Sequence, residues 1–406
     1  MIPPWVPSPR PLRVVEVAAC PWPTTQGTQV HLRGLVRALT RRGHDVHLVT
    51  YHFGEDLPDE GATVHRIPPV PGYRKLRAGP SIAKPLLDGL LLARLAQVVH
   101  KTRPDVLHVH NYEAPWAGYA VRALSGVPVV YTAHNLMIDE LDRYLQGRLL
   151  RAGARGLAGW LDRRVPRMAD RCVALSDAAL PALIELGVSA DRLSSLPPAV
   201  HLEDLGDEPP SAALSAPLVL YAGNPDRYQD LGLLFAAMVL VRRHRPDAVL
   251  RVVSGADLGP AQAQARGLGL GEGVVFRRTS SWAEVRAEIV QARVAALPRG
   301  LCRGAPIKRL NFAGLARPMV ACEGSAHGMG DDAGLRVPDG DVSGFAVALL
   351  RLLEDPSLAG RMGTAARASI LRDSTWQHRV ERLESEFVRA IDACSARGST
   401  VDAGPS

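Results

Sequence analysis

Residues 297–321 decide the fold of the C-terminal half: Leu297-Pro-Arg-Gly-Leu-Cys-Arg-Gly-Ala-Pro-Ile-Lys-Arg-Leu-Asn-Phe-Ala-Gly-Leu-Ala-Arg-Pro-Met-Val-Ala321. The pattern predicts a buried strand, a basic loop with glycines, a helix that begins at Pro306, and a second buried strand. Small residues and cations at a helix N-terminus are suited to bind a phosphate or pyrophosphate group. The order strand, loop, helix, strand predicts an α/β domain.

A similar unit opens the N-terminal half. Residues 13–20 predict a strand, which is followed by a loop of Pro, Thr and Gly and by a helix that ends at Gly43. Further strands are expected at 46–50, 105–110, 127–132, 171–175, 217–223, 248–254, 273–277, 292–297 and 317–322. They alternate with helical stretches, which predicts parallel, doubly wound sheets of the α/β class.

Composition places the domain boundaries. The segment 197–216 is polar and rich in proline, so it is expected to link two domains, and both ends of the chain are expected to be disordered. The expected parts are a tail at 1–11, an N-terminal domain at 12–196, the linker at 197–216, a C-terminal domain at 217–373, a final helix at 374–396 and a tail at 397–406.

Composition also limits the partners. The chain has 406 residues, a formal charge of +7 and an aromatic share of 5%, which is low for stacking on single-stranded nucleic acid, so no nucleic-acid partner is expected. The positive charge fits either a basic, arginine-rich proteome or an anionic partner such as phosphate groups or a lipid surface. Five dispersed cysteines without a CxxC pair fit a reducing cytosol. We therefore expect a cytoplasmic protein, with the inner face of the membrane as a peripheral site.

Two common nucleotide motifs are missing from both strand–helix openings. Neither carries Gly-x-Gly-x-x-Gly, so a nicotinamide-dependent dehydrogenase is poorly supported. The sequence also lacks Gly-x-x-x-x-Gly-Lys-Ser/Thr, which excludes a P-loop nucleotide site.

Five segments, in this order along the chain, carry a resemblance to a known family. They are Pro23-Thr-Thr-Gln-Gly-Thr-Gln-Val-His-Leu-Arg-Gly-Leu-Val-Arg-Ala-Leu39, Arg103-Pro-Asp-Val-Leu-His-Val-His-Asn111, Val127-Pro-Val-Val-Tyr-Thr-Ala-His-Asn135, Ala169-Asp-Arg-Cys-Val-Ala-Leu-Ser176 and Leu335-Arg-Val-Pro-Asp-Gly-Asp341. Over residues 12–393 the chain resembles the family 4 retaining glycosyltransferases of the GT-B architecture. The resemblance implies two Rossmann-like domains that face a central cleft, with the acceptor bound by the N-terminal domain and the nucleotide sugar by the C-terminal one. It also implies that the final helix packs back towards the N-terminal domain.

The chain departs from the common family pattern at two places. Arg303 and Asn311 stand where the family commonly has Glu-x7-Glu, and Asn224 and Gln229 stand where it usually has Arg and Lys. The form Gly-Asn…Tyr-Gln, together with Pro306-Ile-Lys, is similar to a subgroup that pairs Gly-Asn…Tyr-Gln with a Pro-Leu-Lys loop. These departures concern recognition of the donor sugar and ribose.

The resemblance implies a set of site residues. His134 is the expected catalytic residue, and His110 and Asn135 are expected to contact the acceptor. The expected donor-binding residues are Gly27, Thr28, Asn224, Arg227, Gln229, Arg299, Gly304, Pro306, Ile307, Lys308 and Asn311. With uncharged residues at 224 and 229, the diphosphate charge would be met by Arg299 and Lys308.

No metal and no cofactor are expected. We interpret His108 and His110 as facing opposite sides of their strand, with His108 in the core, which argues against a shared metal. Asp339-Gly-Asp341 mimics a metal-binding Asp-x-Asp motif, but its position after Val-Pro predicts a turn before a helix. The resemblance implies that the basic loop and the helix ends replace a metal.

Two basic amphipathic regions, 72–91 and 143–171, combine arginines with leucines and a tryptophan. Such helices can lie on an anionic membrane surface. Leucines that face the core, with a solvated basic face, explain the same pattern, and both interpretations stay open.

The favoured function is a retaining glycosyltransferase, a hexosyltransferase that moves a sugar from a nucleoside diphosphate sugar to an acceptor hydroxyl. The acceptor could be lipid-linked, an envelope glycan or a natural product. Two alternatives stay open: a non-catalytic GT-B partner protein, which the missing Glu pair favours, and a nucleotide-sugar epimerase, which would need carboxylates for acid–base work. The sequence identifies neither the base, the sugar nor the acceptor, nor the oligomeric state.

Overall fold

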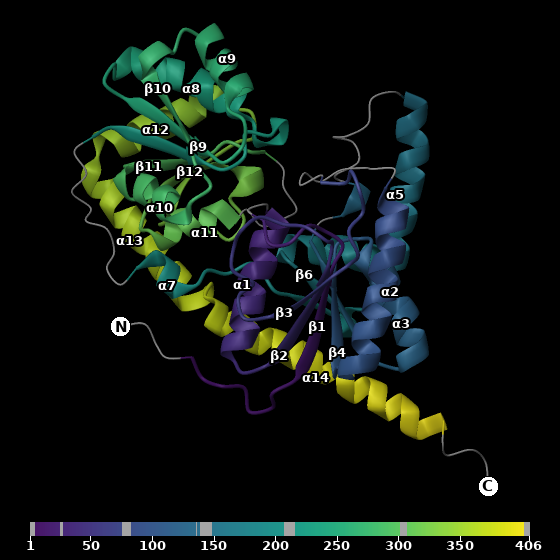
Figure 1. The fold of residues 1–406 in the computed structure, drawn as a ribbon. Helices are drawn as coiled ribbons and strands as arrows, with labels where there is room; N and C mark the ends of the chain where they lie inside the picture. The colour runs from purple at the N-terminus through teal and green to yellow at the C-terminus, as the bar shows by residue number, and fades with distance from the viewer. Residues whose placement is uncertain are drawn as a thin grey trace. The chain divides into compact units, whose positions relative to one another are not determined.

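The computed structural model describes residues 5–24, 27–74, 83–134, 136–138, 148–206, 216–300 and 307–401. The chain divides into two compact units, Pro3–Pro198 with Trp376–Ser406 and Ala199–Thr375, which we call the N-terminal and C-terminal units. Each unit is built on its own parallel sheet (Figure 1). The expected class, a two-domain α/β protein, is confirmed.

The sheet of the N-terminal unit has the order β3-β2-β1-β4-β5-β6-β7 over the described residues, and every pairing is parallel. Its strands are β1 (Arg13–Ala18), β2 (Asp45–Thr50), β3 (Thr63–Arg66), β4 (Val106–His110), β5 (Val129–Ala133), β6 (Arg171–Ala174) and β7 (Leu193–Ser195). The central strands β1, β4 and β5 are buried over almost their whole length, because helices cover both faces of the sheet.

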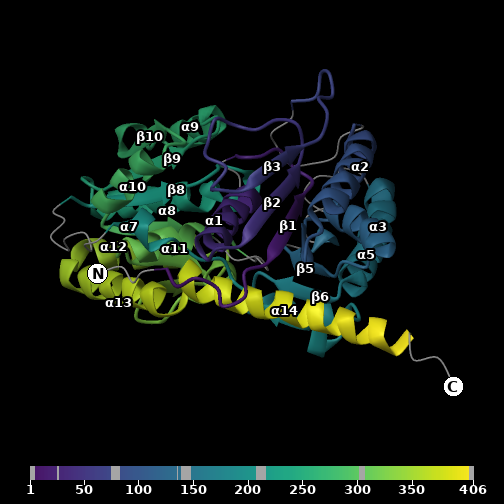
Figure 2. The same ribbon diagram turned by 60° about the horizontal axis from the view of Figure 1, so that its bottom comes forward.

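The helices of the N-terminal unit cover this sheet in two groups. The described helices are α1 (Gly27–Arg41), α2 (Lys84–Thr102), α3 (Ala114–Ser125), α5 (Arg148–Met168), the short α6 (Leu180–Glu185) and α14 (Trp376–Val401). Helices α2, α3 and α5 lie side by side, whereas α14 contacts α1 and strands β4, β5 and β6 (Figures 1 and 2). None of the described helices is long and apolar enough to cross a bilayer.

Side chains of β1 and β4 alternate between the two faces of the sheet. Val15, Val17, Leu107 and Val109 join the apolar core with α2 and α3. The residues between them point to the opposite face, which carries α1 and α14. On that face the register sets Glu16 beside the middle of β4.

The sheet of the C-terminal unit has the order β10-β9-β8-β11-β12-β13 over the described residues, again with parallel pairings. Its strands are β8 (Leu218–Ala222), β9 (Val249–Ser254), β10 (Val274–Arg278), β11 (Val294–Leu297), β12 (Met319–Cys322) and β13 (Gly334–Val337). Its helices are α7 (Leu202–Leu205), α8 (Leu231–His244), α9 (Gly259–Gly267), α10 (Trp282–Gln291), α11 (Ile307–Gly314), α12 (Val342–Glu354) and α13 (Pro356–Asp373).

Two apolar clusters hold the C-terminal unit together, one on each face of the sheet. One joins β8 and β9 to α8, α9 and α12, and the other joins the opposite faces of the central strands to α10, α11 and α13. Aspartate side chains cap the starts of α8, α12 and α13, since Asp230, Asp341 and Asp355 each accept a hydrogen bond from a backbone amide in the first turn.

Buried polar contacts hold α14 against the rest of the N-terminal unit. Glu384 accepts hydrogen bonds from Arg42 Nε at 2.8 Å and Nη2 at 2.7 Å, and its Oε1 lies 2.7 Å from His44 Nε2. Gly34 of α1 leaves room for the indole of Trp376, because a Cβ there would lie 2.5 Å from the indole nitrogen.

Candidate functional site

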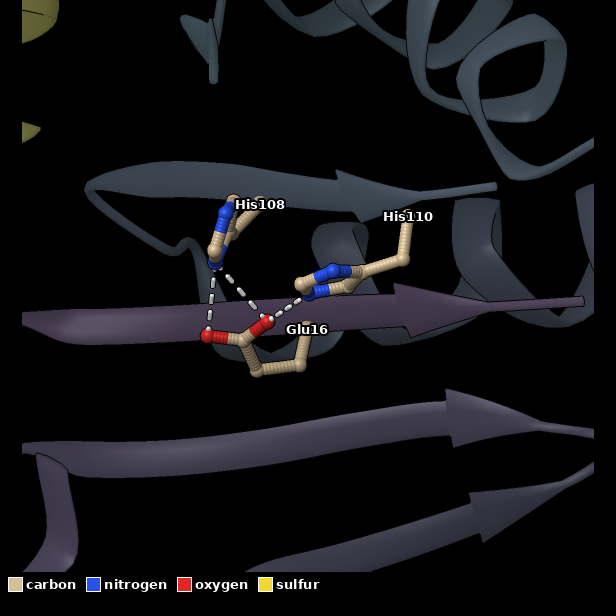
Figure 3. Close-up of side chains that lie close together, drawn as sticks. All are labelled: Glu16, His108 and His110. Atoms are coloured by element: carbon tan, nitrogen blue, oxygen red, sulfur yellow. Dashed lines mark hydrogen bonds and ion pairs between the residues drawn. The ribbon is translucent and has the colours of Figure 1, made fainter. Parts of the chain in front are cut away.

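A buried carboxylate lies at the centre of the N-terminal sheet. Glu16 of β1 and His108 and His110 of β4 are almost completely buried, and both rings point at the carboxylate (Figure 3). His110 Nε2 lies 2.6 Å from Glu16 Oε2, and His108 Nδ1 lies 3.1 Å from Oε1 and 3.0 Å from Oε2. The three side chains therefore form one hydrogen-bonded cluster, which we call the Glu16 cluster.

The carboxylate of Glu16 is ionised. Burial raises its pKa, but the attraction and hydrogen bonds of His108 and His110 outweigh that effect and lower the pKa to about 2. An ionised carboxylate only accepts hydrogen bonds, so each facing ring nitrogen carries a proton.

His134 extends the Glu16 cluster. It follows β5 directly, is half-buried, and its Nε2 lies 3.1 Å from His110 Nδ1. Burial lowers the pKa of His134 well below its usual range, and the nearby histidines add to the effect. The ring of His31 in α1 lies 5.5 Å from that of His134, edge to face, and burial lowers the pKa of His31 to about 3. Both rings are therefore uncharged at neutral pH.

The expected orientation of His108 and His110 was wrong. Side chains two residues apart in a strand share a face, and both rings contact Glu16. His110 also lies deeper than expected for an acceptor-binding residue, because its ring is fully buried and both ring nitrogens are hydrogen-bonded. His134 is the more exposed of the pair.

Sequence reasoning missed Glu16 and His31. The signal for Glu16 was available, since a lone acidic residue interrupts the apolar strand Arg13-Val-Val-Glu-Val-Ala18. A charge in a buried strand needs a partner of opposite or polar character. The neighbouring strand in a doubly wound sheet carries the candidates His108 and His110. No such signal marks His31. The amphipathic pattern of helix α1 would be the same whether or not this ring contacted another histidine.

The start of α1 lies close in sequence to this cluster. Gly27 is the first residue of the helix and Thr28, the second, is half-buried. The amides at a helix start can bind an anion. Asn135 lies outside the described residues.

A lysine lies at the carboxyl end of β8 in the C-terminal unit. Lys308, in the first turn of α11, places its Nζ 2.9 Å from Tyr221 Oη and 2.8 Å from Gln229 Oε1. The hydroxyl of Tyr221 in turn donates to the backbone oxygen of Asn224 at 2.6 Å. Gly223 has a φ of 146°, and a Cβ there would lie 2.8 Å from the ammonium nitrogen. The glycine therefore lets the lysine approach the backbone closely.

Arg299 is another cation of the C-terminal unit that was expected to bind the donor. Its guanidinium lies over the ring of Tyr228, 4.7 Å from the centroid. Arg227 and Asn224 are exposed, whereas Ile307 and Asn311 are half-buried in α11. The structure thus gathers Lys308, Gln229, Tyr221 and Gly223 around one point. Gly304 and Pro306, also expected here, lie outside the described residues, as does Arg303.

The turn predicted at Asp339-Gly-Asp341 is confirmed. Asp339 accepts from the amide of Gly324 at 2.9 Å, Gly340 has a φ of 83°, and Asp341 caps α12. The carboxylates of Asp339 and Asp341 therefore have structural contacts within the turn and at the helix start.

Within the described part of the chain, the ligand atoms of Glu16, His108 and His110 lie within 4.8 Å of one another, and zinc binds such groups. The distance of 2.6 Å between Glu16 and His110 is that of a charge-assisted hydrogen bond.

The models of two protein families match this chain. "Glycosyltransferase Family 4" matches residues 25–204, and "Glycosyl transferases group 1" matches residues 216–355. The first match lies mostly in the N-terminal unit and extends to residue 204, and the second lies within the C-terminal unit.

Relatives and solved structures agree with these matches. D-inositol 3-phosphate glycosyltransferase from Kineococcus radiotolerans is 27% identical over 92% of this chain and 93% of the relative. Sucrose-phosphate synthase from Thermosynechococcus elongatus has a similar structure, with a TM-score of 0.79, 18% identity, and coverage of 94% of this chain and 100% of the other. Anabaena HepE in complex with UDP-glucose has a TM-score of 0.71 at 15% identity, covering 92% of this chain and 98% of the other.

The two parallel-sheet units and these similarities define a glycosyltransferase of the GT-B architecture. Its reaction is the transfer of a sugar from a nucleotide sugar. The chain belongs to glycosyltransferase family 4, as the resemblance in its sequence implied.

Proposed function

We propose that this enzyme transfers a hexose, with retention of anomeric configuration, from a nucleoside diphosphate sugar to an acceptor hydroxyl. The observation that carries the proposal is the position of Lys308 at the carboxyl end of β8. In open α/β sheets, ligands bind beyond the carboxyl ends of the strands. The C-terminal unit then binds the donor diphosphate through Lys308 and Arg299.

The chemistry of Lys308 supports an anionic ligand. Tyr221 Oη and Gln229 Oε1 accept hydrogen bonds from the ammonium and hold it at the carboxyl end of β8. A cation in the first turn of a helix is unfavourable for the helix dipole, and a bound anion offsets that cost. Charge-assisted hydrogen bonds to phosphate are strong, which fits a site that stabilises a departing diphosphate.

The proposed step needs no side-chain nucleophile. The bond between the anomeric carbon and the diphosphate oxygen breaks, and the acceptor oxygen bonds to the same face of that carbon. The acceptor proton passes to the leaving phosphate. Lys308 and Arg299 supply the positive charge for the leaving group, so we propose that the reaction proceeds without a metal.

Two comparisons suggest the first substrates to test. HepE was solved with UDP-glucose, and the relative from Kineococcus radiotolerans is named for inositol 3-phosphate. We propose a UDP-hexose as the first donor and a phosphorylated polyol as the first acceptor, with a lipid-linked acceptor as the second.

A thermal-shift screen with UDP, GDP, ADP, CDP and dTDP tests the donor site. A ligand that binds only the folded protein raises the melting temperature. We expect one nucleotide to do so for the wild type and not for Lys308→Ala, while the control Lys101→Ala, on an exposed residue of α2, keeps the shift. No shift with any of the five would contradict the proposed donor site.

The stereochemistry and the metal are tested on the product. The proton coupling constant at the new anomeric centre reports whether the donor configuration is retained, and an inverted product would refute that part. The rate should be unchanged after treatment with EDTA, and a loss that Mg²⁺ or Mn²⁺ restores would show that the enzyme needs a metal.

We further propose that α3 and α5 contact an anionic membrane. The rings of Trp116 and Trp160 are stacked, 5.8 Å apart, and are 36% and 52% exposed. Leu157, Arg163 and Arg164 are exposed on the same helix α5. Exposed tryptophan with leucine and arginine suits a lipid interface, although a solvated basic face also fits the arginines.

Sedimentation with phospholipid vesicles separates these two interpretations. We expect binding to vesicles that contain phosphatidylglycerol, little binding to pure phosphatidylcholine, and loss of binding in Trp160→Ala. The control Leu371→Ala removes an exposed apolar side chain in α13 of the other unit. Equal binding by Trp160→Ala and wild type would refute the proposed membrane contact.

A further inference from the structure

The hydrogen bonds of the Glu16 cluster determine where His110 carries its proton. The ring of His110 is buried, and burial, with the charge of His108, lowers its pKa even though Glu16 opposes the effect. An uncharged imidazole has a single N–H. Because Nε2 lies 2.6 Å from the ionised carboxylate, that proton is on Nε2 and Nδ1 keeps a lone pair.

The tautomer of His134 follows from that of His110. His134 Nε2 lies 3.1 Å from His110 Nδ1, which can only accept, so His134 donates from Nε2. His134 is itself uncharged, and its Nδ1 therefore carries a lone pair. Within the part of the chain that the structure describes, the hydrogen bond to His110 is the one that this ring makes.

We propose that Glu16, acting through His110, is a positioning residue that fixes His134 as a hydrogen-bond acceptor at Nδ1. An acceptor nitrogen after the end of β5 is suited to a hydroxyl of the sugar or of the acceptor substrate, and it disfavours a phosphate oxygen. The role of Nδ1 towards a hydroxyl rests on the proposed function, whereas the tautomer does not.

His108 provides a matched control for His110. Both rings are buried and donate to Glu16, but His110 alone of the two bridges to His134, while His108 Nε2 lies 2.7 Å from Thr132 Oγ1. Replacing either ring by Phe removes one donor to Glu16. Only the change at 110 removes the contact that fixes His134.

The tautomers can be measured directly by NMR on protein labelled with ¹⁵N at histidine. Nitrogen shifts and couplings to ring carbons distinguish N–H from lone-pair nitrogens. The chain has 13 histidines, so the signals of His134 are assigned by their loss in His134→Asn. We expect the wild type at neutral pH to show N–H at Nε2 and a lone pair at Nδ1. A protonated ring, or N–H at Nδ1, in the wild type would overturn the proposal.

The variants test the route of the effect. We expect His110→Phe and Glu16→Gln to give mixed tautomers at His134 and to lower kcat roughly ten-fold, the value of about one hydrogen bond. We expect His108→Phe to keep the wild-type tautomer. If His108→Phe disturbs His134 as much as His110→Phe does, the Glu16 cluster is only structural.

Two further outcomes are distinguishable. Added Zn²⁺ should leave the signals of His108 and His110 unshifted. A shift at both would overturn the proposal, because a bound metal would replace the protons that are assigned here to the ring nitrogens facing Glu16. Expected tautomers in a protein that transfers no sugar would leave the positioning by Glu16 intact and refute the proposed function instead.

Discussion

Replacing Glu384 by Gln removes the charge that holds α14 against the rest of the N-terminal unit. The side chains of Arg42 and Glu384 are 6% and 11% exposed, and Nε and Nη2 of the arginine donate to the carboxylate at 2.8 and 2.7 Å. Removing one partner of a buried pair leaves the other charge uncompensated, which costs about 3–5 kcal/mol. Since Gln keeps one acceptor oxygen, we expect a loss of about 3 kcal/mol, or roughly 6–12 °C in melting temperature for a unit of this size.

Glu381→Gln is the matched control. Glu381 lies on the same helix and contacts the same arginine at 3.3 Å, but its side chain is 58% exposed. Exposed ion pairs contribute about 0–1 kcal/mol. Urea unfolding followed by circular dichroism compares the two variants. A loss for Glu384→Gln within about 0.5 kcal/mol of that for Glu381→Gln would refute the reasoning.

The pH dependence gives a second test of the same contact. Burial raises the pKa of Glu384, but hydrogen bonds and attraction from Arg42 and His44 outweigh this and lower it. A carboxyl with a lowered pKa in the folded state contributes stability above its unfolded pKa, about 4.3, and loses it as the pH falls through the folded value. The difference between wild type and Glu384→Gln should therefore be constant above about pH 5 and shrink in more acidic solution.

Three other changes have defined outcomes. Gly34→Ala should cost about 1–3 kcal/mol in urea unfolding, because the new Cβ would lie 2.5 Å from the indole of Trp376. The control Gly89→Ala, which meets no described atom within 4 Å, should stabilise by about 0.5–1 kcal/mol. Tyr221→Phe removes the hydroxyl that holds the ammonium beside β8, and calorimetry should show nucleotide binding weakened roughly five- to ten-fold. Glu16→Gln should differ from wild type in stability above about pH 4.3, with the difference vanishing as the pH falls towards 2.

The buried strands could be predicted from sequence, but three short strands at sheet edges could not. Strands β3, β7 and β13 are outermost in their sheets and have only three or four residues. An edge strand is covered on fewer sides, so its sequence needs no run of apolar residues. Thr63-Val-His-Arg66 and Leu193-Ser-Ser195 lack the pattern that identified the central strands.

The candidate sites differ in how many of their residues could be predicted from the sequence. Lys308 was predicted because a cation at a helix start is a local feature. Its partner Tyr221 was not, because that contact joins residues 87 positions apart, which only the sheet brings together. The prediction for the face of His110 was wrong for a simpler reason: residues two positions apart in a strand share a face, and the opposite was assumed. The lone Glu16 in the neighbouring strand would have indicated that both histidines face it.

The Glu16 cluster joins stability and chemistry in a single set of hydrogen bonds. A carboxylate at the centre of a buried sheet is tolerated only if donors meet its charge, so His108 and His110 must both direct protons at it. That requirement leaves His110 with a single lone pair, which faces His134. The protonation pattern at the end of β5 is thus a consequence of how the core accommodates a charge. An apolar residue in place of Glu16 would relieve the core of that charge, but the same change would remove the reason for His134 to present a lone pair.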